Sequence, residues 1–153
     1  MSTGEQARSW SVGPRRVRVL VVDDEASIRS LCRINLELAG LDVSEAQDGL
    51  EAIALVRNET FDVVLLDVMM PHVDGWEVAE LLAGDDSTRN VPVVFLTARA
   101  DPGDFKRGFD LGAVGYVRKP FDPVPLAGYL RRILDGLARG EREALRREIL
   151  EAS

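Results

Sequence analysis

The 153-residue sequence has few of the residues that mark several large classes of protein. Its single cysteine, Cys32, excludes an internal disulfide and suits the reducing cytoplasm. Its single histidine, His72, leaves no histidine pair at metal-ligand spacing. Apolar runs end after about six residues, whereas a membrane-spanning helix needs roughly 20. Residues 1–13 have no apolar stretch, so we expect neither a secretory signal nor a membrane span.

The sequence also has fewer basic than acidic residues. The chain has 26 Asp and Glu against 19 Lys and Arg, which gives a formal net charge of −7. A nucleic-acid-binding face would be basic and clustered, so we expect no direct contact with nucleic acid. Hydrophobic content of 46% and charged content of 29% are ordinary for a globular protein of one domain.

Short apolar runs rich in β-branched residues predict buried strands. We expect strands at residues 17–22, 41–45, 61–66, 92–96 and 114–117. Apolar residues at helical spacing, with glycines at the stops, predict helices between them. We expect these helices at residues 25–39, 49–58, 76–83, 102–111 and from Pro123 onward. Five alternations of strand and helix predict an α/β fold, with a parallel sheet and helices on both of its faces.

The two ends of the chain differ from this pattern. Residues 1–14 are polar and predict a flexible tail, so the folded domain is expected at 15–138. Residues 139–153 predict a helical tail that bends away from the preceding helix, because Gly136 and Gly140 each disfavour a helix interior by about 1 kcal/mol. We expect this tail to be a solvated helix end. A dimer contact or a linker to a further module is the alternative.

Acidic side chains follow two of the predicted strands. Asp23 and Asp24 end the first strand, and Asp67 ends the strand at 61–66. If these strands are parallel neighbours, the carboxylates meet at the edge where open α/β sheets bind ligands. Each pair repels by about 4 kcal/mol at roughly 4 Å and an effective dielectric constant near 20. A hard divalent cation such as Mg²⁺ would balance them. The alternative for Asp24 and Asp67 is an ordinary role in a helix cap or a turn.

Further polar groups follow the other predicted strands. Thr97 ends the strand at 92–96, Tyr116 lies within the last strand, and Lys119 and Pro120 follow it closely. Each has an ordinary interpretation by itself: a strand-end threonine, a half-buried tyrosine and a solvated lysine. Their positions at one edge of the sheet favour a common site.

Together with Met69-Met70-Pro71 and Asp74-Gly75, these residues resemble the receiver domains of two-component response regulators, of the chemotaxis-regulator type. The resemblance covers roughly residues 15 to 138. It implies a doubly wound, flavodoxin-like (βα)5 fold with strand order 2-1-3-4-5. It also implies that Asp67 is the phosphoacceptor of a Mg²⁺-dependent reaction, in which Mn²⁺ is an alternative ion.

The resemblance also assigns the remaining roles. Asp24 would contact the metal directly, Asp23 largely through water, and Met69 through its backbone carbonyl. Lys119 would pair with the phosphoryl group, and the Lys119–Pro120 bond would be cis. Thr97 would donate a hydrogen bond to the phosphorylated state, and Tyr116 would turn inward, so that the face formed by helix 102–111, the Tyr116 strand and the last helix changes for partners.

The function implied is signal reception in the cytoplasm. The donor would be a phosphohistidine on a sensor histidine kinase or phosphotransfer protein, because His72 lies in a loop after Asp67. Enzymatic activity would be limited to self-phosphorylation and slow autodephosphorylation. Downstream, the resemblance implies a protein target or output domain, and it allows a homodimer through the switching face. The chain would be either a stand-alone regulator or the receiver part of a larger regulator or hybrid kinase.

Two other classes fit less well. A phosphatase of the haloacid-dehalogenase type needs a second acid two residues after the nucleophile, and Met69 stands there. A dinucleotide-binding domain needs a glycine-rich turn after the first strand, where this chain has acidic residues.

Overall fold

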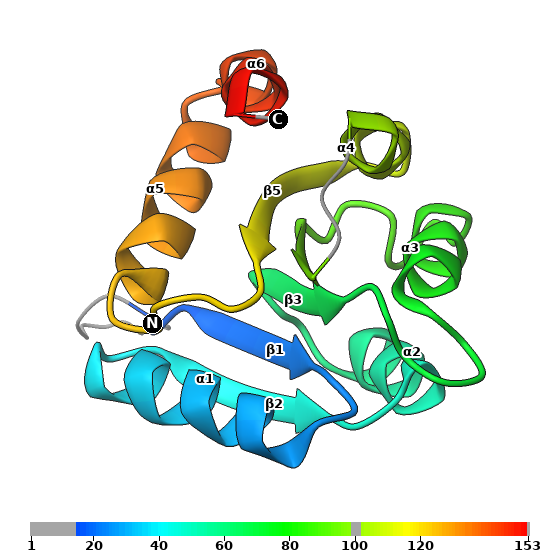
Figure 1. Cartoon of the computed structure of the whole chain (residues 1–153), viewed down its shortest axis with the longest axis vertical. Helices are drawn as coiled ribbons and strands as arrows, with labels where there is room; N and C mark the ends of the chain where they lie inside the picture. The colour runs from blue at the N-terminus through cyan, green and yellow to red at the C-terminus, as the bar shows by residue number, and fades with distance from the viewer. Residues whose placement is uncertain (1–14, 99–101, 153) are drawn as a thin grey trace, which may run out of the picture.

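A computed structural model describes residues 15–98 and 102–152 of the chain. In these ranges one parallel sheet forms the centre of the fold, in the order β2-β1-β3-β4-β5 (Figure 1). The strands are β1 (Arg18–Val22), β2 (Asp42–Ala46), β3 (Val63–Asp67), β4 (Val93–Thr97) and β5 (Ala113–Arg118). The predicted α/β class and strand order are confirmed.

Helices cover both faces of this sheet. They are α1 (Ala26–Leu38), α2 (Gly49–Asn58), α3 (Gly75–Ala83), α4 (Pro102–Asp110), α5 (Leu126–Ala138) and α6 (Arg142–Ala152). Figure 1 shows α1 and α5 on one side and α2, α3 and α4 on the other. None of the described helices is long and apolar enough to span a membrane.

The core has two halves, one on each face of the sheet. Alternate residues of a strand point to opposite faces, so Val19 and Val21 pack with α1 and α5, while Leu20 and Val22 pack with α2 and α3. The central strand β3 is buried over its whole length, as expected for a parallel strand covered on both faces.

Local signals set most of the helix ends. Asp74 and Glu77 form a reciprocal capping box that begins α3. Gly40 (φ 90°) and Gly112 (φ 91°) follow α1 and α4 in the left-handed region that favours glycine, as their positions in the sequence predict. The predicted tail at 1–14 lies outside the described residues.

The predicted start of the last helix is wrong by three residues, because α5 begins at Leu126. Val124 precedes Pro125, and a residue before proline is disfavoured from helical backbone angles. Residues 123–125 therefore form a turn, in which the Leu126 N–H donates to the carbonyl of Pro123 at 3.2 Å.

The prediction for the C-terminal tail is partly right. Gly140 (φ 75°) ends α5 and turns the chain, as expected, whereas Gly136 stays inside α5. The expected solvated helix end is wrong, because α6 packs back on α4, β5 and α5 (Figure 1). Leu145 of α6 is only 8% exposed. Burial of this apolar side chain is the physical reason for the difference.

Candidate functional site

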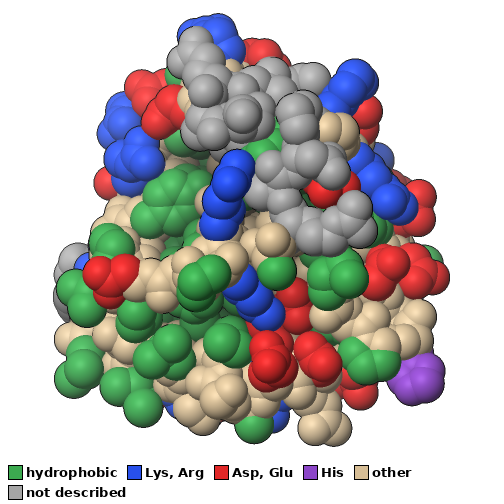
Figure 2. All heavy atoms as spheres, in the orientation of Figure 1, with side chains coloured by type: hydrophobic (Ala, Val, Ile, Leu, Met, Phe, Trp, Pro, Cys, Tyr) green, Lys and Arg blue, Asp and Glu red, His purple; other side chains and the backbone are tan. Residues whose placement is uncertain are grey.

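The register of the sheet brings the predicted acidic residues together. Val22 of β1 lies beside Leu66 of β3, so the residues that follow each strand meet at one edge. Carboxylate oxygens of Asp23, Asp24 and Asp67 lie within 4.8 Å of one another. Figure 2 shows acidic and basic side chains side by side where β1 and β3 end in Figure 1. Asp23 and Asp67 are buried, whereas Asp24 is exposed.

Asp23 is the most deeply placed of the three carboxylates, with no exposed surface. Its Oδ1 accepts a hydrogen bond from the Glu25 N–H at 2.9 Å. Its Oδ2 has no hydrogen-bond donor in good geometry among the described residues, and Nζ of Lys119 lies 2.8 Å away. The same ammonium lies 3.4 Å from Asp67 and 3.7 Å from Glu25. One positive charge thus faces several carboxylates, an arrangement that fits a bound divalent cation with oxygen ligands.

Lys119 is fixed from two directions. Its N–H donates to the carbonyl of Thr97 at 2.8 Å, and its Nζ lies 3.4 Å from Asp67 Oδ2. The Lys119–Pro120 bond is cis, as expected. Burial acts to lower the pKa of Lys119, but the close contact with the Asp23 carboxylate and the charge of Asp67 outweigh it, so that pKa is raised.

Asp67 ends β3 with its carboxylate almost fully buried. Oδ1 accepts a hydrogen bond from the Met69 N–H at 3.2 Å. Burial, together with the charge of Asp23, raises the pKa of the Asp67 carboxyl to about 7, against the opposing effects of Lys119 and the Met69 N–H. A buried carboxylate that a cation would keep ionised is suited to nucleophilic chemistry.

Gly75 allows α3 to begin directly against this strand end. A Cβ at Gly75 would lie 2.3 Å from the carbonyl oxygen of Asp67, which is backbone and has no room to move. The Gly75 N–H also donates to the carbonyl of Val68 at 2.9 Å. In the Asp-Gly pair at 74–75, the aspartate therefore caps α3, and the glycine allows the start of α3 to approach the backbone at the end of β3 closely.

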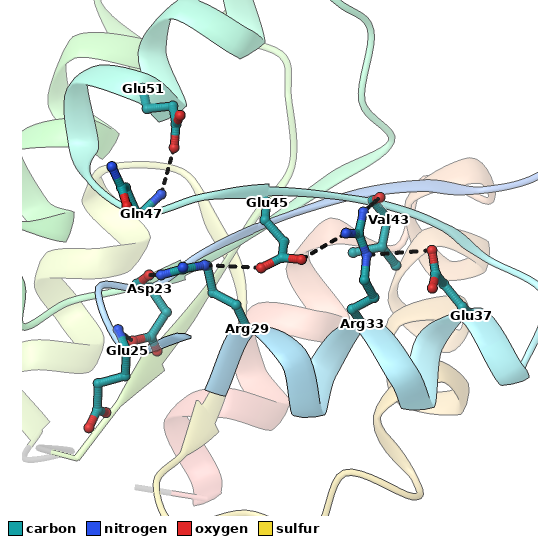
Figure 3. A network of polar contacts seen from close by, with 9 residues as sticks. All are labelled: Asp23, Glu25, Arg29, Arg33, Glu37, Val43, Glu45, Gln47 and Glu51. Carbon is teal, nitrogen blue, oxygen red and sulfur yellow. Dashed lines mark hydrogen bonds and ion pairs between the residues drawn. The ribbon is translucent and has the colours of Figure 1, made fainter. Parts of the chain in front are cut away.

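Arg29 supports the turn that carries the acidic pair, a role that the sequence did not reveal. Its Nη1 donates to the carbonyl of Asp23 at 2.8 Å, and its Nε donates to Glu45 at 3.0 Å. Figure 3 shows Glu45 between Arg29 and Arg33. Because Glu45 is 16 residues from Arg29 in the sequence, no local motif indicates this network.

Tyr116 lies inward, under α4. Its ring centroid is 4.7 Å from that of Phe105 and 5.5 Å from that of Phe95, and its hydroxyl donates to the carbonyl of Asp104 at 2.9 Å. A Cβ at Gly108 would meet this hydroxyl at 1.6 Å, so glycine makes the space. Burial raises the pKa of the Tyr116 phenol. No sequence motif indicates this role of Gly108.

The helix-cap roles considered for Asp24 and Asp67 are not observed, but Asp67 does make a turn-type hydrogen bond, since its Oδ1 accepts from the Met69 N–H two residues on. The N-cap position of α1 is Glu25, whose side chain makes no capping hydrogen bond, and α3 is capped by Asp74 rather than Asp67. Thr97 is buried at the end of β4, beside Lys119. His72 is exposed in the loop after Asp67. The structure thus brings the predicted carboxylates and lysine together and leaves the histidine outside.

A five-stranded, doubly wound sheet with an acidic cluster and a lysine at its carboxyl edge defines a class of α/β domain, and comparison with known proteins identifies the family. Residues 19–131 match the family described as "Response regulator receiver domain". The chain therefore belongs to the receiver domain family of two-component response regulators. The phosphatase and dinucleotide-binding alternatives are excluded.

Individual relatives agree with this assignment. The chain is 41% identical over 133 residues to the "DNA-binding dual master transcriptional regulator RpaA" of Synechocystis, covering 87% of this chain and 55% of that protein. It is 36% identical over 126 residues to the phosphate regulon regulatory protein PhoB of Pseudomonas aeruginosa, covering 82% and 55%. The chain thus spans about half the length of these curated relatives.

Solved structures agree on the fold. The chemotaxis protein CheY4 of Vibrio cholerae superposes with a TM-score of 0.74 at 35% identity, covering 78% of this chain and 99% of that one. The "BeF3 Activated DrrB Receiver Domain" superposes with a TM-score of 0.69 at 30% identity, covering 79% and 99%.

The raised pKa of Asp67 predicts how stability depends on pH when metal is absent. The folded-state pKa of about 7 lies above the ordinary value, so the native state binds the proton more tightly. Ionisation of Asp67 therefore lowers the free energy of unfolding. The loss has its full size above pH 7 and declines as the pH falls toward about 4. We expect Asp67→Asn to raise the free energy of unfolding by about 2 kcal/mol at pH 8 and by much less at pH 5. Urea denaturation in EDTA measures both values, and a pH-independent difference would contradict the prediction.

Proposed function

We propose that this chain receives a phosphoryl group on Asp67 from the phosphohistidine of a sensor histidine kinase or phosphotransfer protein. The observation that carries the proposal is the cluster of Asp23, Asp24 and Asp67 within 4.8 Å, with Lys119 Nζ 3.4 Å from Asp67. It supports phosphoryl transfer because a nucleophilic carboxylate, acidic metal ligands and a cation for the phosphoryl oxygens lie at one place.

In the proposed reaction, an oxygen of Asp67 attacks the phosphorus of the donor. The other ring nitrogen of the phosphohistidine first takes a proton from water. The new O–P bond then replaces the N–P bond, and the imidazole leaves as the neutral base. Lys119 stays beside the incoming oxygens and offsets their charge. Its position is held by the hydrogen bond from its N–H to Thr97. Later hydrolysis of the acyl phosphate by water restores the carboxylate.

Asp23, Asp24, Asp67 and the backbone carbonyl of Met69 are the groups proposed to hold Mg²⁺, or Mn²⁺ in its place. Their fit rests on the buried Asp23 Oδ2, which only Lys119 balances in the described part of the chain. When bound, such an ion supplies positive charge that makes attack by one anion on another feasible.

The proposed output is a change of the α4–β5–α5 face, defined here by Phe105, Val114, Tyr116, Tyr129, Arg132 and Ile133. Thr97 would donate to the phosphoryl group, and Tyr116 would respond on the neighbouring strand. Support comes from the position of Tyr116, whose hydroxyl contacts α4 and whose backbone N–H donates to the Tyr129 hydroxyl of α5 at 3.1 Å. One side chain thus connects three elements of the face.

For the phosphodonor, α1 offers a suitable surface. Leu31, Ile34 and Leu38 form an exposed apolar stripe at helical spacing, and Leu38 is 82% exposed. Figure 2 shows hydrophobic side chains gathered where Figure 1 draws α1. Since α1 begins directly after Asp23 and Asp24, a donor helix packed on this stripe would bring its histidine toward Asp67.

The family and the length of the relatives support a proposal for the classes of partner. The proposed partners are the kinase or phosphotransfer protein and a target protein or output domain, all met in the cytoplasm. Because the curated relatives are about twice as long and include DNA-binding regulators, the alternative is that these residues are the receiver part of a longer regulator.

Incubation with a small phosphodonor tests the proposal. With Mg²⁺ and acetyl phosphate or phosphoramidate, we expect the intact mass to rise by one phosphoryl group, because the acceptor needs no kinase once a high-energy donor is present. With EDTA in place of Mg²⁺, the adduct should not form. An adduct that forms equally in EDTA, or none with Mg²⁺ and either donor, would overturn the proposal.

A further inference from the structure

The α4–β5–α5 face is occupied by α6, which follows α5 after a tight turn. Gly140 takes φ 75°, its N–H donates to Leu137 at 3.0 Å, and the Glu141 N–H donates to Gly136 at 2.8 Å. This turn sends the chain back over the domain, so that α6 lies over β5 between the ends of α5 and α4 (Figure 1).

A notch in α5 receives Leu145. Gly136 has no side chain, and a Cβ at that position would lie 3.3 Å from Cδ1 of Leu145. Leu145 thereby joins the core half formed by α1 and α5, in company with Ile133 and Leu130. Its burial is the apolar part of the contact between α6 and the domain.

Ion pairing fixes the direction of α6 along the face. Arg132 Nη1 lies 2.7 Å and 3.1 Å from the two carboxylate oxygens of Glu148, and Arg142 Nη1 donates to the carbonyl of Gly112 at 3.4 Å. Glu148 is three residues after Leu145, so both side chains lie on one side of the helix. Between α6 and the face remains a cavity of about 360 Å³, with Phe105, Tyr116 and Glu148 in its walls.

We infer that the α4–β5–α5 face is a groove for an amphipathic helix with the pattern Leu-x-x-Glu, and that α6 occupies part of it in cis as a built-in cover. Leucine enters the notch at Gly136, and glutamate pairs with Arg132. An 11-residue helix is marginal by itself in water, so α6 depends on this seat for its order. A partner helix with the same pattern would have to displace it.

The inference deepens the proposed function, since it names what covers the output face, but its test needs no phosphodonor. The experiments can therefore contradict the role of α6 as a cover without contradicting the role of Asp67 as phosphoacceptor, and the reverse also holds.

Amide hydrogen exchange of residues 142–152 tests the seat in the full chain. We expect Leu145→Ala to speed exchange in α6 by about tenfold or more, because a buried leucine is lost. Alanine is the best helix former, so helix propensity is not the cause. Arg147→Ala, an exposed position of the same helix, is the matched control and should change little. Unchanged exchange in Leu145→Ala would overturn the inference.

A charge swap tests the ion pair. We expect Glu148→Arg and Arg132→Glu each to speed exchange by about two- to fivefold, as an exposed pair allows, and the double variant to restore protection. Additive losses in the double variant would contradict direct pairing.

A peptide of residues 140–153 tests the groove in trans. The peptide should bind Leu145→Ala about tenfold more tightly than it binds the parent chain, in which the tethered α6 competes at high effective concentration. Equal binding to the two proteins would overturn the inference that α6 covers the groove. Protection of α6 only at concentrations where sedimentation shows a dimer would also overturn it, because the groove would then be occupied by a second copy of the chain.

Discussion

Asp67→Asn should abolish phosphoryl incorporation, lowering its rate by at least about a thousandfold. The substitution keeps the size of the side chain and its place at the end of β3, but removes the oxygen nucleophile. Lys119 and Asp23 stay in place, so binding of the phosphodonor is largely retained while the new O–P bond no longer forms. Intact-mass measurement after incubation with Mg²⁺ and acetyl phosphate gives the rate directly.

The matched control is Asp86→Asn. Asp86 is 92% exposed in the turn after α3, and its ion pair with the exposed Arg89 lies at the surface, so the same chemical change there should leave incorporation unaltered. If Asp67→Asn were labelled at the parent rate, another residue would be the acceptor, and peptide mapping of the adduct would identify it.

Asp24→Asn should lower the affinity for Mg²⁺ by about 10- to 100-fold and slow phosphorylation at subsaturating Mg²⁺ by a similar factor. Asp24 is the exposed member of the cluster, so its carboxylate reaches an incoming ion without displacing Lys119 from Asp23. Removing it also relieves repulsion among the carboxylates, and the metal-free variant should be as stable as the parent or more so.

Fluorescence of Trp76 gives the Mg²⁺ affinity. Trp76 is buried and directly follows Gly75, which packs on the Asp67 backbone, while Arg107 lies 4.8 Å over its ring. The other tryptophan of the chain is Trp10, which lies outside the described residues. Titrations in a Trp10→Phe background therefore report Trp76 alone. Asp86→Asn again serves as control, and an unchanged Mg²⁺ midpoint in Asp24→Asn would remove Asp24 from the proposed ligand set.

The sheet and the meeting of the carboxylates were predictable because they depend on local pattern. Short β-branched runs identify strands, alternation with helices makes the sheet parallel, and residues after parallel strands share an edge. This rule is enough to predict that Asp23, Asp67 and Lys119 lie together. The functional roles of these residues stay predictions until the chemistry is measured.

Contacts between distant segments were not predictable in the same way. The pairing of Arg29 with Glu45 depends on how α1 lies on β2, and the need for glycine at 75 arises only when α3 reaches the Asp67 carbonyl. Gly136 shows the limit best. A glycine near a helix end predicts that the helix stops there. Here the helix continues through Gly136, and the space left by the absent side chain is occupied by Leu145.

The space that Gly108 leaves for Tyr116 has a consequence for the way α4 responds. Pro102, Gly103 and Gly108 make α4 a poor helix by intrinsic preference, since an interior glycine disfavours it by about 1 kcal/mol. Its order therefore depends on Phe105 and Phe109 packed around the tyrosine ring. Withdrawal of that one ring would remove the aromatic packing beneath α4 and leave its contacts with α6 and Trp76. The expected response to that loss is fraying of α4, so the order of α4 depends on whether the tyrosine ring is in place.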